Sequence, residues 1–135
     1  GTISTNPENH ELMVRARQAK IAQIADSIPA LQLINAQQNK DVLLVGWGST
    51  EGHLHAAANE LGCALAQFNY ICPLPRNTRE VLSQYKRIIV CELNTGQFAT
   101  YLRAQFPEIT FEQYNEIQGQ PFAIERIVNF VMNND

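Results

Sequence analysis

Gly46-Trp47-Gly48-Ser49-Thr50 is the stretch of sequence that decides the fold. It follows directly on an uninterrupted apolar run, 42–45, and precedes a segment with helical spacing, 51–61. A buried strand that leads through a glycine turn into a helix is a βα unit. In such a unit the backbone N–H groups of the turn and the positive end of the helix dipole face the carboxyl edge of the sheet. Because α/β proteins bind ligands or partners at that edge, the stretch predicts both a fold class and a functional face.

The rest of the chain continues this alternation of strands and helices. The first pair is predicted at 41–46 and 50–61, from the hydrophobic pattern and the turn residues. A short apolar run at 31–34 is compatible with an edge strand. Strands separated by helices imply a mostly parallel sheet, here of about five strands, with helices on both faces, which is an α/β fold. The remaining elements are strands at 64–70, 87–93 and 109–113 and helices at 77–85, 96–105 and 123–132.

Capping residues mark several of these helix ends. Ser49 or Thr50 is expected to cap the first helix of the α/β pattern at its start, and Gly62 to end it. Asn77 and Glu80 have capping-box spacing at the start of the next helix, although the usual first residue of that box is Ser or Thr.

The N-terminal segment predicts a helical arm. Asn6-Pro7-Glu8 supplies an N-cap, a proline tolerated at the first helical position and an acid in the first turn, and the helix is expected to run to about Ser27. We therefore divide the chain into an arm at 1–30 and one α/β domain at 31–135. The apolar residues of the arm recur at helical spacing and are expected to pack on a neighbour by one stripe, formed by Met13, Ile21, Ile24 and Ile28.

Composition excludes several classes of function. The 135 residues carry a net charge of −3, from ten basic and thirteen acidic side chains, and the basic ones are scattered. This distribution argues against nucleic acid as a partner. The apolar runs fall far short of the roughly 18–20 residues of a membrane helix. No charged-then-apolar signal segment opens the chain, so we expect a cytoplasmic protein without membrane contact. Because residue 1 is Gly and not Met, we expect a piece of a longer polypeptide.

The glycines of the deciding stretch do not form a dinucleotide fingerprint. Gly46, Gly48 and Gly52 are spaced G-x-G-x-x-x-G, one residue too long, and Glu51 stands where the third glycine belongs. A negative side chain at the mouth of a pyrophosphate site is unfavourable. The favoured interpretation is a tight βα turn in which glycine permits positive φ, with Trp47 as an exposed or interface-facing aromatic side chain.

Histidine and cysteine spacing predicts no metal site. His53 and His55 are two residues apart, so on a helix they point in different directions. Cys63, Cys72 and Cys91 match none of the spacings of zinc or iron–sulfur sites and are expected to be reduced and mostly buried. A catalytic Cys91 would need a histidine beside it, and core packing is the favoured interpretation.

Two polar residues, Glu92 and Asn94, follow at the end of the strand predicted at 87–93. They could hydrogen-bond a partner's backbone or cap the helix that starts at Gly96, and capping alone accounts for both. Reasoning from residues therefore yields an α/β domain with a polar, turn-rich carboxyl edge and no complete catalytic constellation.

A family resemblance rests on five segments that occur in order and at nearly the family's spacing. The chain resembles the C-terminal domain of the alpha subunit of 2-oxoacid:ferredoxin oxidoreductases, most closely the 2-oxoglutarate type. The match spans essentially the whole chain, and five segments in register are specific where any one would be weak. They are Asn6-Pro7-Glu8-Asn9-His10-Glu11, Gly46-Trp47-Gly48-Ser49-Thr50, Pro73-Leu74-Pro75, Glu92-Leu93-Asn94-Thr95-Gly96-Gln97 and Gly119-Gln120-Pro121-Phe122.

The resemblance implies a transketolase C-terminal-like fold, a three-layer α/β/α domain whose first strand, at 31–35, runs antiparallel to the others. Parent enzymes of this family use thiamine diphosphate with magnesium, a [4Fe-4S] cluster and coenzyme A. The present sequence has no Gly-Asp-Gly…Asn diphosphate motif, no cluster-spaced cysteines and no obvious activating glutamate. The resemblance therefore implies that this chain binds none of these groups and catalyses nothing alone.

Two functions remain open for the carboxyl edge. The leading hypothesis is assembly with the remaining domains of the alpha subunit, the beta subunit and, through the complex, ferredoxin. The alternative is a small-molecule site for an anionic effector or part of coenzyme A, held by N–H groups of the glycine turn. A free-standing enzyme that uses Cys91 is the least favoured. Leu54, Phe98 and Phe122 are candidates for exposed apolar patches. The interface or ligand-edge candidates are Gly46, Trp47, Gly48, Ser49, Thr50, Pro73, Pro75, Glu92, Asn94, Gln97, Gln120 and Phe122.

Overall fold

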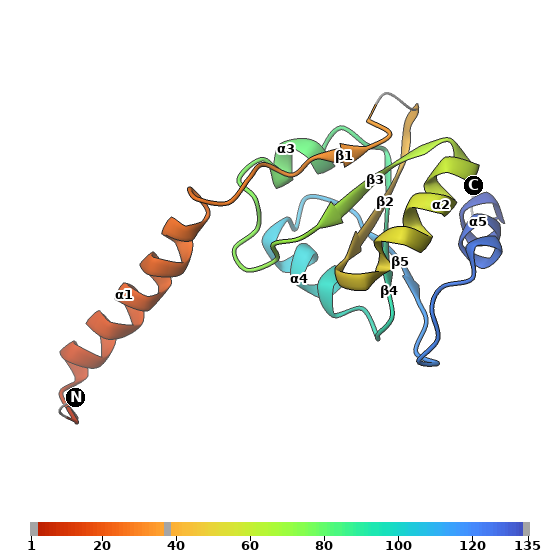
Figure 1. Cartoon of the computed structure of the whole chain (residues 1–135). Helices are drawn as coiled ribbons and strands as arrows, with labels where there is room; N and C mark the ends of the chain where they lie inside the picture. The colour runs from red at the N-terminus through yellow and green to blue at the C-terminus, as the bar shows by residue number, and fades with distance from the viewer. Residues whose placement is uncertain (1–2, 37–38, 134–135) are drawn as a thin grey trace.

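The computed structural model describes residues 3–36 and 39–133. A five-stranded sheet lies between two layers of helices, and a long N-terminal helix projects away from this body (Figure 1). In chain order the helices are α1 Pro7–Ile24, α2 Glu51–Leu61, α3 Thr78–Leu82, α4 Gln97–Gln105 and α5 Ile124–Asn133, with a 3₁₀ turn, η1, at Gly48–Thr50. The strands are β1 Leu33–Ile34, β2 Asn39–Trp47, β3 Cys63–Phe68, β4 Arg87–Glu92 and β5 Glu112–Asn115.

The sheet has the order β1-β3-β2-β4-β5. Strands β2 to β5 are parallel, and β1 pairs antiparallel with β3, so the predicted mixed α/β sheet is confirmed. The chain leaves β2 for its neighbour on one side, β3, and then crosses to its neighbour on the other side, β4. The strand order therefore reverses at the carboxyl ends of β2 and β4, which is the switch point where open α/β sheets form a crevice.

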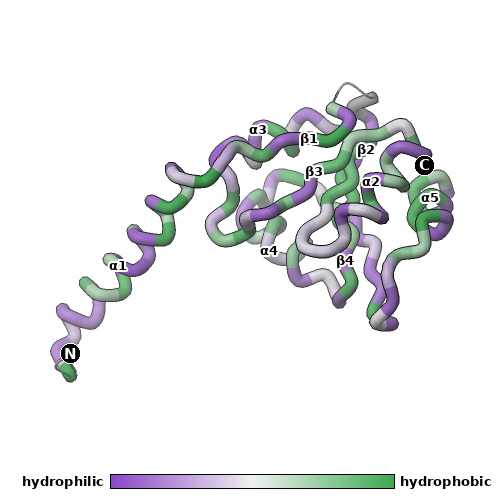
Figure 2. Tube along the Cα trace, in the orientation of Figure 1, coloured by the Kyte–Doolittle hydropathy of each residue, from purple (hydrophilic) through white to green (hydrophobic). Residues whose placement is uncertain are grey.

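Alternating side chains of the strands supply two separate cores, because successive residues of a strand point to opposite faces. Leu43 and Val45 of β2 pack with α3 and α4, whereas Leu44 packs with α2 and α5. Figure 2 shows hydrophobic residues concentrated along the strands, whereas α1 alternates hydrophilic and hydrophobic residues. Two apolar faces on the central strands are what require helices on both sides of the sheet.

Several predicted boundaries are wrong, among them the ends of β3, at Phe68 and not 70, and of α3, at Leu82 and not 85. The last strand begins at Glu112 and not at 109, because the Ile109 N–H bonds the Phe106 carbonyl in a turn that follows α4. Helix α1 ends at Ile24, and its continuation to Ser27 consists of tighter turns in which each N–H bonds the carbonyl three residues earlier. Such turns are common where helices end.

The predicted caps are confirmed at some helix ends and wrong at others. The Asn6 side chain accepts the Asn9 N–H at 2.6 Å, and Gly62 ends α2 with φ 62°. Neither predicted cap residue bonds the start of α2, since the Thr50 hydroxyl donates to the Trp47 carbonyl. Asn77 does not cap α3 either: its amide bonds both the N–H and the carbonyl of Leu31, 46 residues away.

The apolar stripe of α1 is not covered by the described residues. No residue of α1 is buried, and Met13, Ile21 and Ile24 are 46%, 43% and 39% exposed. The expectation that this stripe packs on a neighbour stays a prediction, since no part of the chain at 3–36 and 39–133 buries it. The division into an arm at 1–30 and a domain at 31–135 stays a prediction.

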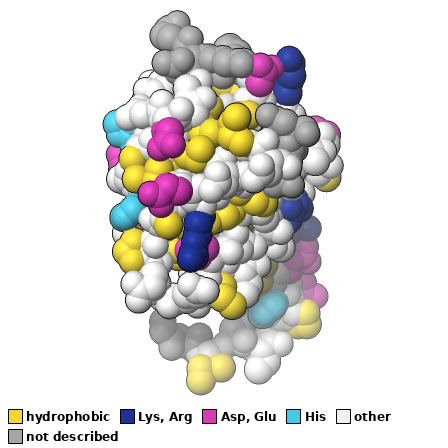
Figure 3. Space-filling model, turned by 90° about the vertical axis from the view of Figure 1, so that its right-hand side faces the viewer, with side chains coloured by type: hydrophobic (Ala, Val, Ile, Leu, Met, Phe, Trp, Pro, Cys, Tyr) yellow, Lys and Arg dark blue, Asp and Glu magenta, His cyan; other side chains and the backbone are white. Residues whose placement is uncertain are grey.

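The surface matches the scattered charge of the sequence. On the face seen in Figure 3, basic side chains stand singly among acidic and hydrophobic ones. Among the described helices, none has the length and apolar character needed to cross a membrane.

Candidate functional site

The loops at the carboxyl edge bring together residues that are far apart in the sequence. The turn after β2 lies beside the loop after β4 and the segment that leads into α5, and these three line a hollow of about 370 Å³. On the other side of β2, Trp47 lies beside the loop after β3 and the start of α4, where a second hollow of about 320 Å³ opens. Six of the twelve candidate residues thus line two neighbouring hollows.

Glu92 and Asn94 are committed to the start of α4. The buried Glu92 carboxylate accepts the N–H groups of Phe98 at 2.8 Å and Ala99 at 2.9 Å, and Asn94 Oδ1 accepts those of Gly96 and Gln97. A carboxylate at this position also complements the positive end of the helix dipole. Glu92 and Asn94 therefore act as caps, and the N-terminus of α4 is closed to an external anion.

Trp47 joins the two loops. It is half-buried, and its indole Nε1–H donates to Glu92 Oε1 at 3.3 Å. Its ring lies 6.2 Å from that of Phe98, which in turn lies 6.4 Å from the Tyr101 ring. Trp47, Phe98 and Tyr101 thus form an aromatic wall of the second hollow, which Ile71, Cys72 and Gln97 complete. The wall is apolar, which suits a hydrophobic side chain better than a charged ligand.

The turn after β2 is built around glycine. A side chain at Gly46 would lie 2.2 Å from Leu54 Cδ1 and 2.9 Å from Gln67 Oε1, so only glycine fits there. Gly48 has φ +64°, which favours glycine, and its carbonyl accepts a hydrogen bond from Gln67 Nε2 at 3.0 Å. Ser49 is exposed. Unlike the start of α4, the start of α2 has no side-chain cap.

The first hollow lies directly at this uncapped start. Ser49, Thr50 and His53 form one wall, and Leu93 with residues 119–122 forms the other. Gln120 is exposed, whereas Phe122 is buried in the core beside Tyr114. The hollow offers the exposed Ser49 hydroxyl and the His53 imidazole beside a helix start that no side chain caps, a set that suits a small anion or a polar partner.

The two proline candidates, Pro73 and Pro75, have different structural surroundings. Pro75 is buried, and its carbonyl accepts the N–H and the hydroxyl of Thr78, which fixes the start of α3. Pro73 is half-buried, follows a cis peptide bond after Cys72, and lines a hollow that faces α1.

Three expected patch residues are not on the surface. Leu54, Phe98 and Phe122 are buried, because each packs into one of the two cores. Sequence reasoning also missed Gln67, Ile71 and Tyr101, none of which carries a motif. Gln67 offered one signal, since it is a polar residue inside an otherwise apolar strand.

The described residues contain no catalytic constellation. Cys91 is fully buried, and burial raises the pKa of its thiol, so the prediction that it packs in the core is confirmed. Burial likewise raises the pKa of Cys63 to about 11. Cys72 is exposed, so the expectation of mostly buried cysteines holds for two of the three. Within residues 3–36 and 39–133, no group of three or more His, Cys, Asp or Glu side chains could hold a metal ion.

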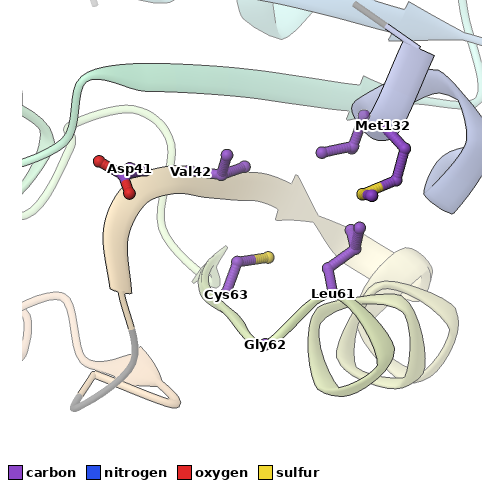
Figure 4. Close-up of a pocket in the computed structure, with 7 residues that line it drawn as sticks. Asp41, Val42, Leu61, Gly62, Cys63 and Met132 are labelled. Atoms are coloured by element: carbon purple, nitrogen blue, oxygen red, sulfur yellow. The ribbon is translucent and has the colours of Figure 1, made fainter. Parts of the chain in front are cut away.

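A further hollow lies at the opposite edge of the sheet. Figure 4 shows it between the starts of β2 and β3 and the ends of α2 and α5, with Leu61 and Met132 on its helical side and Cys63 on β3. Its volume is about 330 Å³. Helix C-termini present carbonyl groups and the negative end of the dipole, which disfavours anions, so an anionic ligand would bind at the carboxyl edge instead.

No protein-family profile matches the chain, but comparison with known proteins finds similar ones. It is 37% identical, over 97% of its length, to the 2-oxoglutarate oxidoreductase subunit KorA of Mycobacterium tuberculosis. The chain is thus similar to one part of a 2-oxoglutarate oxidoreductase subunit. The resemblance drawn from the five sequence segments is confirmed.

A solved structure agrees with KorA. The 2-oxoglutarate:ferredoxin oxidoreductase from Magnetococcus marinus, with 2-oxoglutarate, coenzyme A and succinyl-CoA bound, superimposes with a TM-score of 0.85 and 29% identity over 98% of the chain. The chain spans 20% of KorA and 24% of that solved chain. Both oxidoreductases are therefore several times longer than the domain described here.

Proposed function

We propose that this chain is the C-terminal domain of the alpha subunit of a 2-oxoglutarate-type 2-oxoacid:ferredoxin oxidoreductase and that it serves assembly. In the parent enzyme, 2-oxoglutarate would be decarboxylated oxidatively, the acyl group passed to coenzyme A and the electrons to ferredoxin. The beta subunit and the other domains of the alpha subunit would be its partners. Location in the cytoplasm belongs to the same proposal.

One observation supports the assembly role: the Glu92 carboxylate, the buried charge of the carboxyl edge, forms its hydrogen bonds within the domain. Glu92 is 1% exposed and accepts three hydrogen bonds, from Trp47, Phe98 and Ala99. It therefore has little capacity left for a substrate or a metal. What the edge offers instead is an aromatic hollow around Trp47, and large aromatic side chains in pockets are typical anchors of interfaces.

The described residues do not fit the parent's other cofactors. A [4Fe-4S] cluster needs several thiolates together, but Cys63 and Cys91 are buried in the core and Cys72 is exposed near α4. Magnesium with a diphosphate needs clustered oxygen ligands, and no such cluster of acidic side chains lies within the described parts of the chain. We therefore place thiamine diphosphate, magnesium and the cluster outside these residues.

The test is co-expression of this chain with the remainder of the alpha subunit and the beta subunit. We expect the three parts to purify as one complex that reduces a viologen dye with 2-oxoglutarate and coenzyme A. The remainder without this chain should show little activity. Full activity without the chain would contradict the assembly role, and turnover by the chain alone would contradict its lack of catalytic groups.

A second function has a specific observation in its favour. The hollow at Ser49 and His53 adjoins the uncapped start of α2, where an anionic effector or the phosphates of coenzyme A could bind. Titration of the chain with coenzyme A, followed by the fluorescence of Trp47, tests it. Saturable binding that Ser49→Glu abolishes would support a ligand site, whereas an unchanged signal up to millimolar concentration would exclude it.

A further inference from the structure

A groove runs between α1 and the body of the domain. One part is the aromatic hollow bounded by Trp47, Phe98 and Tyr101. The other is a hollow of about 600 Å³ between α1 and the end of α4, where Arg17 and Ile21 face the body. Because the two hollows share Cys72 and Tyr101, they form one continuous surface, which we name the α1 groove. Figure 1 shows how α1 leaves the body and so opens its inner side.

The α1 groove has apolar surface on both sides. On the body, Trp47, Tyr101 and Ile71 are only partly covered, whereas Phe98 lies buried behind them. On α1, Ile21 is exposed although it faces this wall. Two apolar surfaces that face each other across open space lose solvent contact together when one partner enters between them. Such a site favours a segment with a large hydrophobic side chain.

The groove also carries a cation that lacks a partner. Arg17 lies on the α1 side, and no carboxylate among residues 3–36 and 39–133 pairs with it. By contrast, four other arginines of the described chain have a carboxylate partner. These are Arg15, Arg76, Arg79 and Arg87. A guanidinium at the rim of an apolar groove selects a partner that brings its own carboxylate.

We propose that the α1 groove binds a segment of another domain of the parent oxidoreductase. A large apolar side chain of that segment enters the hollow beside Trp47, and an adjacent carboxylate pairs with Arg17. The proposal rests on the proposed function, since it names the surface by which the domain assembles. It commits to a protein segment because the aromatic wall is apolar and the single cation lies at its margin.

Cys72 allows a direct measurement of occupancy, because it is exposed in the groove while Cys63 and Cys91 are buried. In the purified parent complex, the rate of alkylation at Cys72 is measured by peptide mass spectrometry. The reference is a cysteine introduced by Lys20→Cys, on an exposed part of α1 that does not line the groove. We expect Cys72 to react at least about tenfold more slowly than the reference, as a covered interface core requires.

A charge reversal tests the second contact. Arg17→Glu should weaken association of the chain with the remaining subunits about tenfold, the effect of losing one well-placed ion pair and gaining a repulsion. The matched control Lys20→Glu makes the same change of charge on the same helix outside the groove and should leave association unchanged.

The outcomes separate the two proposals. If the complex forms but Cys72 reacts as fast as the reference, the groove is not the contact surface and only the assembly role stands. If no complex forms, the assembly role itself is wrong. If the chain alone forms a concentration-dependent dimer in which Cys72 is protected, the occupant is a second copy and the proposed segment is wrong.

Discussion

Two strand-to-helix loops lie side by side at the carboxyl edge, and they differ in whether side chains cap the helix that follows. After β4, the side chains of Glu92 and Asn94 bind four N–H groups at the start of α4. After β2, the chain passes through Gly48 into a 3₁₀ turn, and no side chain caps α2. The side chains of the loop after β4 therefore stabilise the helix start, whereas the exposed Ser49 of the turn after β2 does not cap α2.

The difference shows why a polar edge is not by itself a ligand site. Carboxylates and amides near helix starts are typical of binding loops, but they are equally typical of caps. Only the hydrogen-bond partners decide between the two. By that criterion the loop after β4 is structural, and the loop after β2 remains open to a ligand or a partner.

The largest effect should follow from Glu92→Ala. The change leaves the buried N–H groups of Phe98 and Ala99 without an acceptor, and we expect the free energy of unfolding to fall by about 3 kcal/mol. Urea unfolding followed by circular dichroism measures it. The exposed Glu80→Ala should stay within about 0.5 kcal/mol of the parent chain. If both variants lose the same small amount, the loop after β4 is not a structural cap.

A smaller effect should distinguish the two glycines that flank the other loop, Gly46 in β2 and Gly52 in α2. A methyl group at Gly46 would overlap Leu54 Cδ1, so Gly46→Ala should lower the free energy of unfolding by about 1–3 kcal/mol. Gly52 has open space around it in α2, and Gly52→Ala should stabilise the chain by about 0.5 kcal/mol. Thermal unfolding of the pair is the measurement, and equal melting temperatures would contradict the packing around Gly46.

The third prediction compares the two loops directly. Asn94→Ala removes an acceptor from two N–H groups and should cost about 1 kcal/mol, the usual effect of losing a cap. The corresponding change in the loop after β2, Ser49→Ala, removes an exposed side chain at an uncapped helix start and should stay within about 0.5 kcal/mol. A cost of Ser49→Ala as large as that of Asn94→Ala would mean that α2 is capped after all.

The last effect depends on pH, is negligible at neutral pH and arises at the opposite edge. Burial raises the pKa of Cys63 from 9.0 to about 11. Between these values the unfolded chain loses the thiol proton while the folded chain keeps it, so the free energy of unfolding falls as pH rises. Urea titrations at pH 8, 9.5 and 10.5 measure this slope. Cys63→Ala should reduce it, whereas the difference between the Asn94 and Ser49 variants should not change with pH.

The order of the elements was predictable, because apolar runs such as the one in β2 mark buried strands without tertiary information. The glycine that ends α2 was predictable for the same reason: Gly62 acts through its own backbone. Boundaries such as the start of β5 were not, because the Ile109 turn forms against the end of α4.

Long-range polar contacts were beyond sequence reasoning. Asn77 looks like a local cap, yet its amide binds Leu31, and nothing in the sequence around either residue indicates the other. The capping role of Glu92 was favoured from the sequence, but its further hydrogen bond, from Trp47, 45 residues away, was not predictable. The candidate residues were expected at the carboxyl edge, but which of them bond within the domain depends on tertiary contacts such as that of Gln67 with the Gly48 carbonyl.

The direction of β1 also determines where the chain enters the domain. Because β1 runs against β3, the residues just before Leu33 lie beside the carboxyl end of β3, where Pro29–Gln32 share a small hollow with Asn69 and Tyr70. A parallel first strand would have placed α1 at the amino edge, a full strand length away. The single reversed strand thus brings the end of α1, rather than the far end of the sheet, to the side of the molecule that carries Trp47.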